Sequence, residues 1–286
     1  MSTPALTRFA PLLFVGLWST GFIGAKLGLP HAEPLSFLLT RYLIVLGLMS
    51  VIAVATRAPW PRDARQWFHI GVAGLLVQAI YLGGVFVSIS KGLPAGVSSL
   101  VVGIQPLLTA GGAGWLLGET VLARQWFGLV LGFIGVALVV SGKIGSGFGF
   151  DALWPALIAL GGITAGTLYQ KRFCPSFDWR TGSIAQFLPT AVATAIVVSL
   201  TEDFRIGWAP DFIFALGWLV LVLSLGAVSL LNWLIRHGSA VNIASLFYLV
   251  PPTTALMAWA LFDERLAGMA LVGMVLAVWG VYLARK

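Results

Sequence analysis

The chain has 286 residues, of which 59% are hydrophobic and only 9% are charged, whereas a soluble domain carries about 25% charged residues. So few charges cannot cover a water-exposed surface, so lipid must be the solvent for most of the chain. The single cysteine, Cys174, excludes a disulfide framework and a cysteine metal site, and the formal charge of +7 fits membrane orientation better than nucleic-acid binding, which needs basic clusters.

Ten apolar runs are long enough for membrane helices, each of which needs about 20 residues. They cover 9–28, 36–56, 67–90, 95–117, 126–142, 152–172, 182–200, 212–236, 241–262 and 267–284. The fifth run is short. The runs are continuous rather than alternating, which disfavours a β-barrel. Their short connections leave no room for a soluble domain, and the phosphate-binding pattern GxxxxGK[ST] is absent, which excludes an ATP-driven pump in this chain.

The second half of the chain repeats the first at an offset of 145 residues, the distance from Gly16 to Gly161. The coinciding pairs include Gly21 and Gly166, Lys26 and Lys171, Pro106 and Pro251, Thr109 and Thr254, and Glu119 and Glu264. We therefore expect one repeat over 8–142, a linker over 143–151 and a second repeat over 152–286. Each repeat holds five spans, and because five is odd the second must enter the membrane in the opposite sense. This inverted arrangement puts a substrate site near mid-depth between the repeats.

Lysine and arginine predict the orientation, because they favour the cytoplasmic side. If the N-terminus is cytoplasmic, eleven basic residues lie inside and six lie outside or just within the outer end of a span. The outer set is Lys26, Arg41, Lys91, Lys143, Arg205 and Arg265. We therefore predict that both termini are cytoplasmic.

Several features of the sequence resemble those of a known family. The segment Gly16-Leu17-Trp18-Ser19-Thr20-Gly21-Phe22-Ile23 is similar to the opening of EamA-type members of the drug/metabolite transporter superfamily. The other landmarks are Arg41, Pro106, Gly118, Glu119, Gly128, Gly132 and Gly135, with Pro251, Asp263 and Glu264 in the second half. The resemblance implies an all-α carrier of ten transmembrane helices in the cell's inner membrane, usually exporting small metabolites such as amino acids. The second half departs from the pattern at Gly161-Gly162-Ile163, where no tryptophan matches Trp18.

Polar groups within the spans are the candidate binding residues, because they are costly in lipid unless they pair or line a cavity. Gln105 and Pro106 lie near the middle of the fourth span, and Pro251 matches Pro106 in the ninth. A proline frees a backbone carbonyl, so each span is predicted to break there, although a packing kink is the alternative. The further candidates for substrate binding are Trp18, Ser19, Thr20, Gln78, Tyr81, Thr164, Thr167, Asn232 and Tyr248. For the hydroxyl residues the alternative is a hydrogen bond to their own helix.

The charged candidates have two interpretations each. Arg41 lies just inside the second span, where it can extend to the membrane surface or clamp a carboxylate. Glu119, Arg124, Glu264 and Arg265 lie at helix ends and are expected to cap helices or form gate ion pairs. No Asp or Glu falls in the middle of a span, so the sequence gives no support for proton coupling.

The sequence therefore predicts a secondary carrier for a small amphipathic solute, working by alternating access as a uniporter or exchanger. The alternatives are a broad efflux carrier for drugs or toxicants, a membrane subunit without transport activity, and a membrane-embedded enzyme. The enzyme would need clustered His, Asp or Glu at one depth, which the chain lacks. We expect no cofactor, metal, ATP or nucleic acid. The expected partners are the solute and the lipid bilayer, and a monomer is the simplest assembly.

Overall fold

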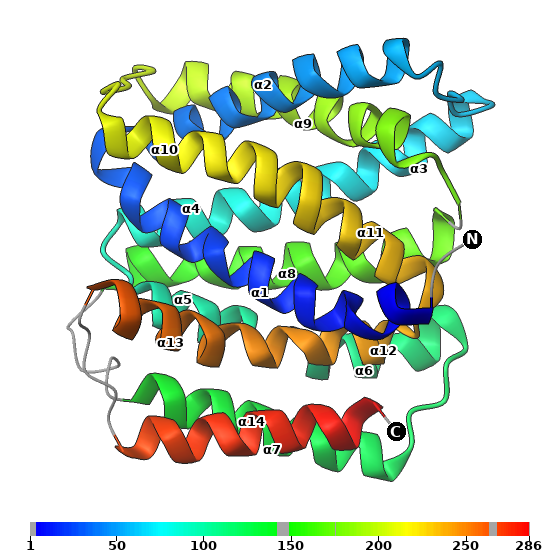
Figure 1. The fold of residues 1–286 in the computed structure, drawn as a ribbon, viewed down its shortest axis with the longest axis vertical. Helices are drawn as coiled ribbons and strands as arrows, with labels where there is room; N and C mark the ends of the chain where they lie inside the picture. The colour runs from blue at the N-terminus through cyan, green and yellow to red at the C-terminus, as the bar shows by residue number, and fades with distance from the viewer. Residues whose placement is uncertain (1–3, 142–148, 175, 263–267, 286) are drawn as a thin grey trace.

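The computed structural model describes residues 4–141, 149–174, 176–262 and 268–285. The described chain is helical, and its long helices run back and forth along one common direction (Figure 1). The chain begins and ends at the same end of this bundle, which we call the terminal face. The other end, where α1 finishes and α2 begins, is called the opposite face.

The first repeat contains five spans, two of which consist of several helical segments. Its elements are α1 (Pro4–Gly28), η1 (Leu29–His31), α2 (Pro34–Ala55), α3 (Ala64–Gly74), η2 (Leu75–Leu82), α4 (Gly83–Ser90), α5 (Ala95–Val102), α6 (Gln105–Leu117) and α7 (Ala123–Val140). The third span is α3, η2 and α4 in continuous succession. The fourth is α5 and α6, which are separated by Gly103 and Ile104.

The second repeat has the same order of five spans, but among the described residues it has no counterpart of η1, and it carries the additional segment η5 in its fourth span. Its elements are α8 (Phe150–Phe173), α9 (Trp179–Thr201), α10 (Pro210–Trp218), η4 (Leu219–Ala227), α11 (Val228–His237), α12 (Ala240–Ser245), η5 (Leu246–Leu249), α13 (Val250–Phe262) and α14 (Gly268–Arg285). Both ends of α13 and of α14 lie 145 residues after the ends of α6 and α7. The offset found in the sequence is therefore an offset between structural elements.

The ten predicted spans agree with the helices to within a few residues. Nine helical runs in the described residues are long and apolar enough to cross a membrane. The tenth, α7, is shorter, as the short fifth run predicted, although it begins at Ala123 rather than at 126. The all-α, ten-helix fold class is confirmed.

The helix ends follow from local sequence. Asp63 and Ser239 accept hydrogen bonds from the Gln66 and Asn242 amides at 2.7 and 3.2 Å, which caps α3 and α12. At the other end of a helix, Gly118 adopts φ +69°, a left-handed conformation that closes α6 at little steric cost. These signals position the short connections between spans.

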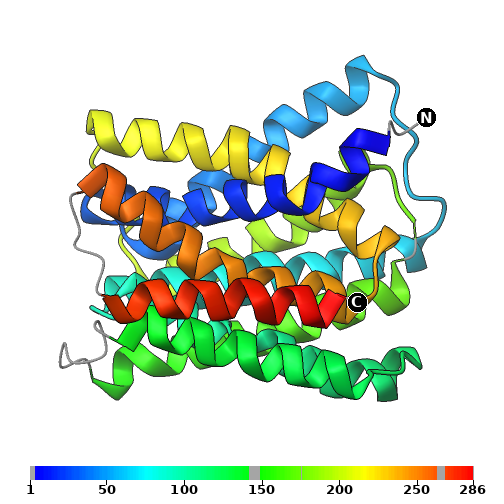
Figure 2. The same ribbon diagram turned by 60° about the horizontal axis from the view of Figure 1, so that its bottom comes forward.

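Close packing of α7 against α14 reveals the relative direction of the two repeats. A Cβ atom added at Gly128 would lie 2.6 Å from the Ala284 amide nitrogen, and one at Gly135 would overlap Ala277. Residues later in α7 therefore contact residues earlier in α14, so these equivalent helices are antiparallel. They form the lower layer of the bundle in Figure 1, and Figure 2 brings this layer forward. The repeats are inverted, as the odd number of spans predicted.

Both repeats also contain a π-helical stretch in their third span, η2 in the first and η4 in the second. π-helical turns are rare and occur frequently at functional sites. The predicted breaks at the prolines are present too, but each proline lies in the first turn of a new helix, α6 or α13. Because the first turn lacks an internal partner for its N–H groups, proline is tolerated there.

Candidate functional site

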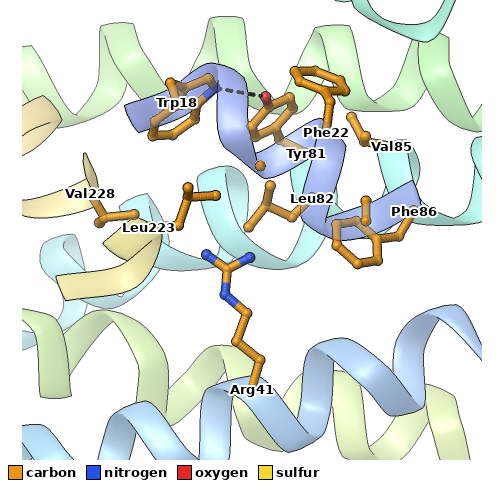
Figure 3. Close-up of a pocket in the computed structure, with 11 residues that line it drawn as sticks. Trp18, Phe22, Arg41, Tyr81, Leu82, Val85, Phe86, Leu223 and Val228 are labelled. Carbon is orange, nitrogen blue, oxygen red and sulfur yellow. Dashed lines mark hydrogen bonds between the residues drawn. The ribbon is translucent and has the colours of Figure 1, made fainter. Parts of the chain in front are cut away.

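A small cavity lies between the two repeats. Arg41, which lines it, lies about 10 Å along α2 from the opposite face, because it follows Pro34 by seven residues and each residue of an α-helix rises about 1.5 Å. The volume of the cavity is about 30 Å³, and an adjoining space of about 10 Å³ reaches Gly103 and Pro251 at the two helix breaks. The residues labelled around it in Figure 3 are Trp18, Phe22, Arg41, Tyr81, Leu82, Val85, Phe86, Leu223 and Val228. This volume has room for a water molecule but not for a metabolite, so the described conformation is closed.

Aromatic rings form one wall of the cavity. The Trp18 indole nitrogen donates a hydrogen bond to the Tyr81 hydroxyl at 3.3 Å, and the two rings are nearly parallel with centroids 6.4 Å apart. Phe247 meets the Trp18 ring edge-on at 5.5 Å. Trp18 is thus held by a residue from each repeat, and it lines the cavity as a fixed apolar surface.

Arg41 supplies the only charge among the residues that line the cavity. Its side chain is 1% exposed and points from α2 toward Trp18 and Tyr81 (Figure 3). The Arg41 Nε donates to the Ser224 Oγ at 2.9 Å, and Ser224 in turn donates to the Leu219 carbonyl. The two terminal nitrogens, Nη1 and Nη2, have no hydrogen-bond partner within the described part of the chain. Of the two interpretations of Arg41, extension to the membrane surface does not fit this geometry.

The polar residues at the two helix breaks connect helices of opposite repeats. The Ser19 Oγ donates to the Val15 carbonyl at 2.7 Å and lies 3.4 Å from the Val250 carbonyl at the start of α13. In the mirrored position, the Gln105 Nε2 donates to Thr109 at 3.3 Å and to Thr167 at 3.5 Å. Gln105 does not line either central space, and its Oε1 is buried without a partner among the described residues.

The remaining predicted binding residues lie around the cavity rather than in its wall. Thr20 accepts a hydrogen bond from the Trp218 indole at 2.9 Å beside a groove on the outside of the bundle, and Thr164 bonds to its own helix. Gln78 and Tyr248 are buried, and each has a side-chain oxygen without a partner in the described chain. Pro106 is buried at the start of α6.

Asn232 belongs to a separate buried cluster. It accepts a hydrogen bond from Gln170 at 2.8 Å and donates to Gln186 at 3.4 Å. Sequence reasoning missed Ser224, which contacts Arg41, and Gln186 of this separate cluster. Gln186 was detectable because it lies 145 residues after Arg41, and Ser224 because it is a lone hydroxyl in an aliphatic stretch.

Carboxylates at the helix ends cap helices across the repeats. Glu119 accepts hydrogen bonds from the Ala240 amide at 3.1 and 3.2 Å, which caps α12. At the opposite face, Glu202 accepts from the Ser36 amide at 2.7 Å and from its hydroxyl at 2.6 Å. Arg124 is exposed. The other two predicted gate residues, Glu264 and Arg265, lie outside the described residues.

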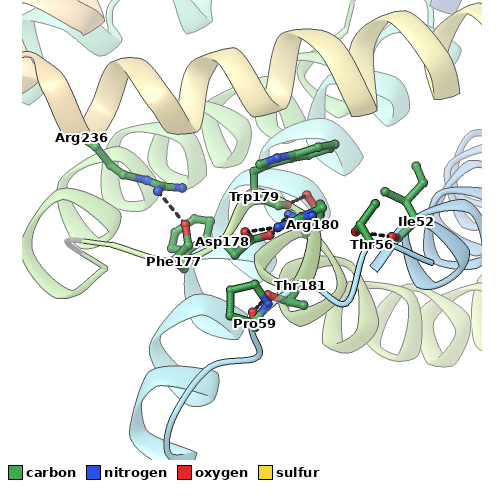
Figure 4. Close-up of polar contacts among 10 residues, drawn as sticks. Ile52, Thr56, Pro59, Phe177, Asp178, Trp179, Arg180, Thr181 and Arg236 are labelled. Carbon is green, nitrogen blue, oxygen red and sulfur yellow. Dashed lines mark hydrogen bonds and ion pairs between the residues drawn. The ribbon is translucent and has the colours of Figure 1, made fainter. Parts of the chain in front are cut away.

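The loop between α8 and α9 is fastened at the terminal face (Figure 4). Arg236 donates to the Phe177 carbonyl at 2.6 Å and lies over the Phe177 ring at 4.2 Å. Arg180 forms a two-pronged ion pair with Asp178, which holds the pKa of that carboxyl below its usual range. Burial raises the pKa of the neighbouring Cys174 thiol to about 12. No group of three or more potential metal ligands gathers in the parts of the chain described.

Comparison with known proteins agrees with this architecture. The sequence model of the EamA-like transporter family matches residues 9–141 and 152–285. The chain is 31% identical to "Uncharacterized transporter YvbV" of Bacillus subtilis, over 97% of this chain and 91% of that protein. It is 25% identical to "Probable amino-acid metabolite efflux pump" of Escherichia coli K12, over 95% and 92%. A solved crystal structure has the same fold, with a TM-score of 0.78, 19% identity and coverage of 99% and 97%.

Proposed function

We propose that this chain, which belongs to the EamA-like transporter family, exports small amphipathic metabolites, amino acids among them, across the cell's inner membrane. The chain is a multi-pass membrane transporter and not an enzyme. The proposed cycle is alternating access, as uniport or as exchange.

The observation that carries this proposal is the closed cavity between the repeats. It offers a cation, Arg41, opposite a fixed aromatic surface, Trp18. An amphipathic solute needs both surfaces, one for its polar group and one for its apolar group. Since about 30 Å³ is too small for such a solute, the centre must widen to admit it. The helix breaks beside Gly103 and Val250 are the places where backbone can rearrange at this depth.

Alternating access also needs contacts that release at each end. At the opposite face, Glu202 holds the start of α2, and Gly207 donates to the His31 carbonyl at 2.7 Å. At the terminal face, Glu119 holds α12, and the Lys171 amine donates to the Gly238 carbonyl at 2.6 Å. We infer that one of these sets separates when the cavity opens toward that side.

The relatives support the direction and the class of solute. One is named "Probable amino-acid metabolite efflux pump", and another, 25% identical, is named "Uncharacterized inner membrane transporter YedA" of Escherichia coli K12. Broad efflux of aromatic cations is the second candidate function. It is less favoured, because a cation would meet the guanidinium of Arg41.

The test is uptake by purified protein in proteoliposomes, with a panel of amino acids, nucleobases and aromatic cations. We expect saturable uptake of at least one amino acid. Trp18→Ala should reduce this uptake about tenfold or more, given about 1.5 kcal/mol for the ring contact. Trp115→Ala is the matched control, because Trp115 is 89% exposed. Transport of cations alone would contradict the proposal.

A further inference from the structure

Arg41 is a buried cation without a counter-charge. Its guanidinium stays protonated in proteins, and a charge in the apolar interior costs several kcal/mol unless an ion pair or full hydrogen bonding compensates it. Only Nε is bonded, to Ser224, while Nη1 and Nη2 have no partner among the described residues. Together these two nitrogens carry four N–H groups.

None of the described acidic residues lines the cavity that contains Arg41. Each lies at a helix end or in a connection, and the set is Glu33, Asp63, Glu119, Asp151, Asp178, Glu202, Asp203 and Asp211. The titratable groups that act electrostatically on Arg41 are Tyr42 and Tyr81. Tyr42 already donates its hydroxyl proton to the Gln78 carbonyl, and Tyr81 accepts from Trp18. Neither is an anion, so the described chain supplies no counter-charge.

The shape of the site selects the kind of anion. Ser224 fixes the Nε edge, so the free Nη atoms present a planar pair of donors to the cavity. This arrangement suits the two oxygens of a carboxylate. Around the donors the wall is apolar, with Phe22, Phe86 and Leu223. The wall therefore fits an organic acid with an apolar body better than a hydrated inorganic ion. It holds no acidic side chain for an ammonium group.

We propose that Arg41 binds the carboxylate of the transported solute through Nη1 and Nη2, and that the site requires this carboxylate but not an α-ammonium group. This inference rests on the proposed transport function. It narrows the solute class to organic acids with an apolar body, including those amino acids that carry one.

The first experiment measures binding by thermal unfolding of the purified full-length protein in detergent. The probes are 3-phenylpropionate, its neutral isostere 3-phenylpropionamide, and phenethylamine, which has the ring and the ammonium but no carboxylate. A ligand that binds only the folded state raises the unfolding temperature with its concentration. We expect 3-phenylpropionate to raise it, and the amide and the amine to leave it unchanged. Equal shifts from the acid and the amide, or no shift from the acid, would overturn the proposal.

Variants then assign the binding to Arg41. Arg41→Gln should abolish the acid-dependent shift, and Arg41→Lys should weaken apparent affinity about tenfold or more, because lysine keeps the charge without the planar pair of donors. Ser224→Ala should weaken affinity less, because Arg41 loses its orientation but not its charge. Arg172→Gln is the matched control, since Arg172 is exposed. If Arg41→Gln fails to fold, the lysine variant and the wild-type probe series still decide the question. A full acid shift in Arg41→Lys would overturn the two-donor contact.

Chloride and phosphate separate the proposed acid site from a general anion site. We expect neither to reproduce the shift at the concentration at which 3-phenylpropionate saturates. An equal chloride shift would overturn the part of the proposal that assigns an organic acid. This binding series does not depend on transport. A carrier that binds the acid but moves no amino acid would contradict only the proposed function.

Discussion

At the residue scale, depth along a helix did not determine what Arg41 does. Both a snorkelling side chain and a carboxylate clamp fit a position about 10 Å inside a span. The neighbours of α2 argue against the first, because η4 brings Ser224 to the Nε atom and the Arg41 side chain is only 1% exposed. Sequence alone identified Trp18, Arg41 and Tyr81 as candidates, since polar and aromatic groups are conspicuous in lipid. It could not distinguish these from Thr20, which faces the outside of the bundle.

Gln105 provides a test of how hydrogen bonds at a helix break affect transport. Gln105→Ala removes two bonds, to Thr109 and Thr167, but Thr167 keeps its bond to the Ile163 carbonyl. We expect a stability loss of about 1 kcal/mol and a larger, about tenfold, loss of flux, because α6 must hold its position against α8 during the cycle. Flux is measured in proteoliposomes and folded protein by size-exclusion chromatography. A fall in folded protein that matches the fall in flux would instead indicate a packing role.

Cys174 gives a chemical measure of packing at the terminal face. It is the single cysteine of the chain, and burial raises the pKa of its thiol to about 12. The reactive thiolate is therefore scarce at pH 7 to 9. We expect N-ethylmaleimide to label the folded protein slowly throughout this range and to label it rapidly in denaturing detergent. Mass spectrometry measures the rates. Rapid labelling of the folded protein at pH 7 would mean that Cys174 is exposed.

At the element scale, apolar runs predicted the helices well because a membrane span must be long, continuous and apolar. Residues 123–125 were missed at the start of α7 because Arg124 and Gln125 are polar, yet Gln125 caps the helix through the Leu122 amide at 3.0 Å. The π-helical turns of η2 and η4 were not predicted. An extra residue per turn changes no hydropathy value, so only tertiary packing makes it visible.

Glycines on α7 test whether α7 and α14 need their close approach. A Cβ atom at Gly135 would overlap the α14 backbone at Ala277, whereas a Cβ at Gly161 would meet nothing within 4 Å. We expect Gly135→Ala to lower the unfolding temperature in detergent, because the helices must move apart. Gly161→Ala is the matched control and should be neutral or stabilising, by up to about 1 kcal/mol from helix propensity. Equal effects of the two variants would argue against tight packing here.

At the scale of the whole molecule, the inverted repeat gives a prediction about topology. Five spans separate the connection between the repeats from the N-terminus, and another five separate it from the C-terminus. We expect a reporter fused after Gly145 to lie outside the cell and one fused after Lys286 to lie in the cytoplasm. Alkaline phosphatase activity and green fluorescence report the two sides. Both reporters on one side would be incompatible with five spans in each repeat.

The buried charge of Arg41 bears on whether transport is coupled to protons or to exchange of solute. A proton-driven carrier needs a group near the moving site that takes up and releases a proton. Arg41 stays charged, and the described carboxylates are at the helix ends, where several cap neighbouring helices. The empty carrier therefore retains an uncompensated cation, whereas a bound carboxylate neutralises it. Reorientation of the loaded carrier should be easier than reorientation of the empty one, which favours exchange over net uniport.

We therefore predict that flux increases severalfold when unlabelled solute is present on the far side of the membrane, and that a pH gradient drives little accumulation. The solute for this measurement is an amino acid, because its net charge hardly changes between pH 6 and 8, whereas a simple weak acid crosses the bilayer in its neutral form. Proteoliposomes with matched and opposed gradients, with and without an uncoupler, provide the comparison. Uphill accumulation that the uncoupler abolishes would refute the prediction. In that case the proton must bind outside the central cavity, and the carboxylates at the helix ends, Glu119 and Glu202 first, become the groups to substitute.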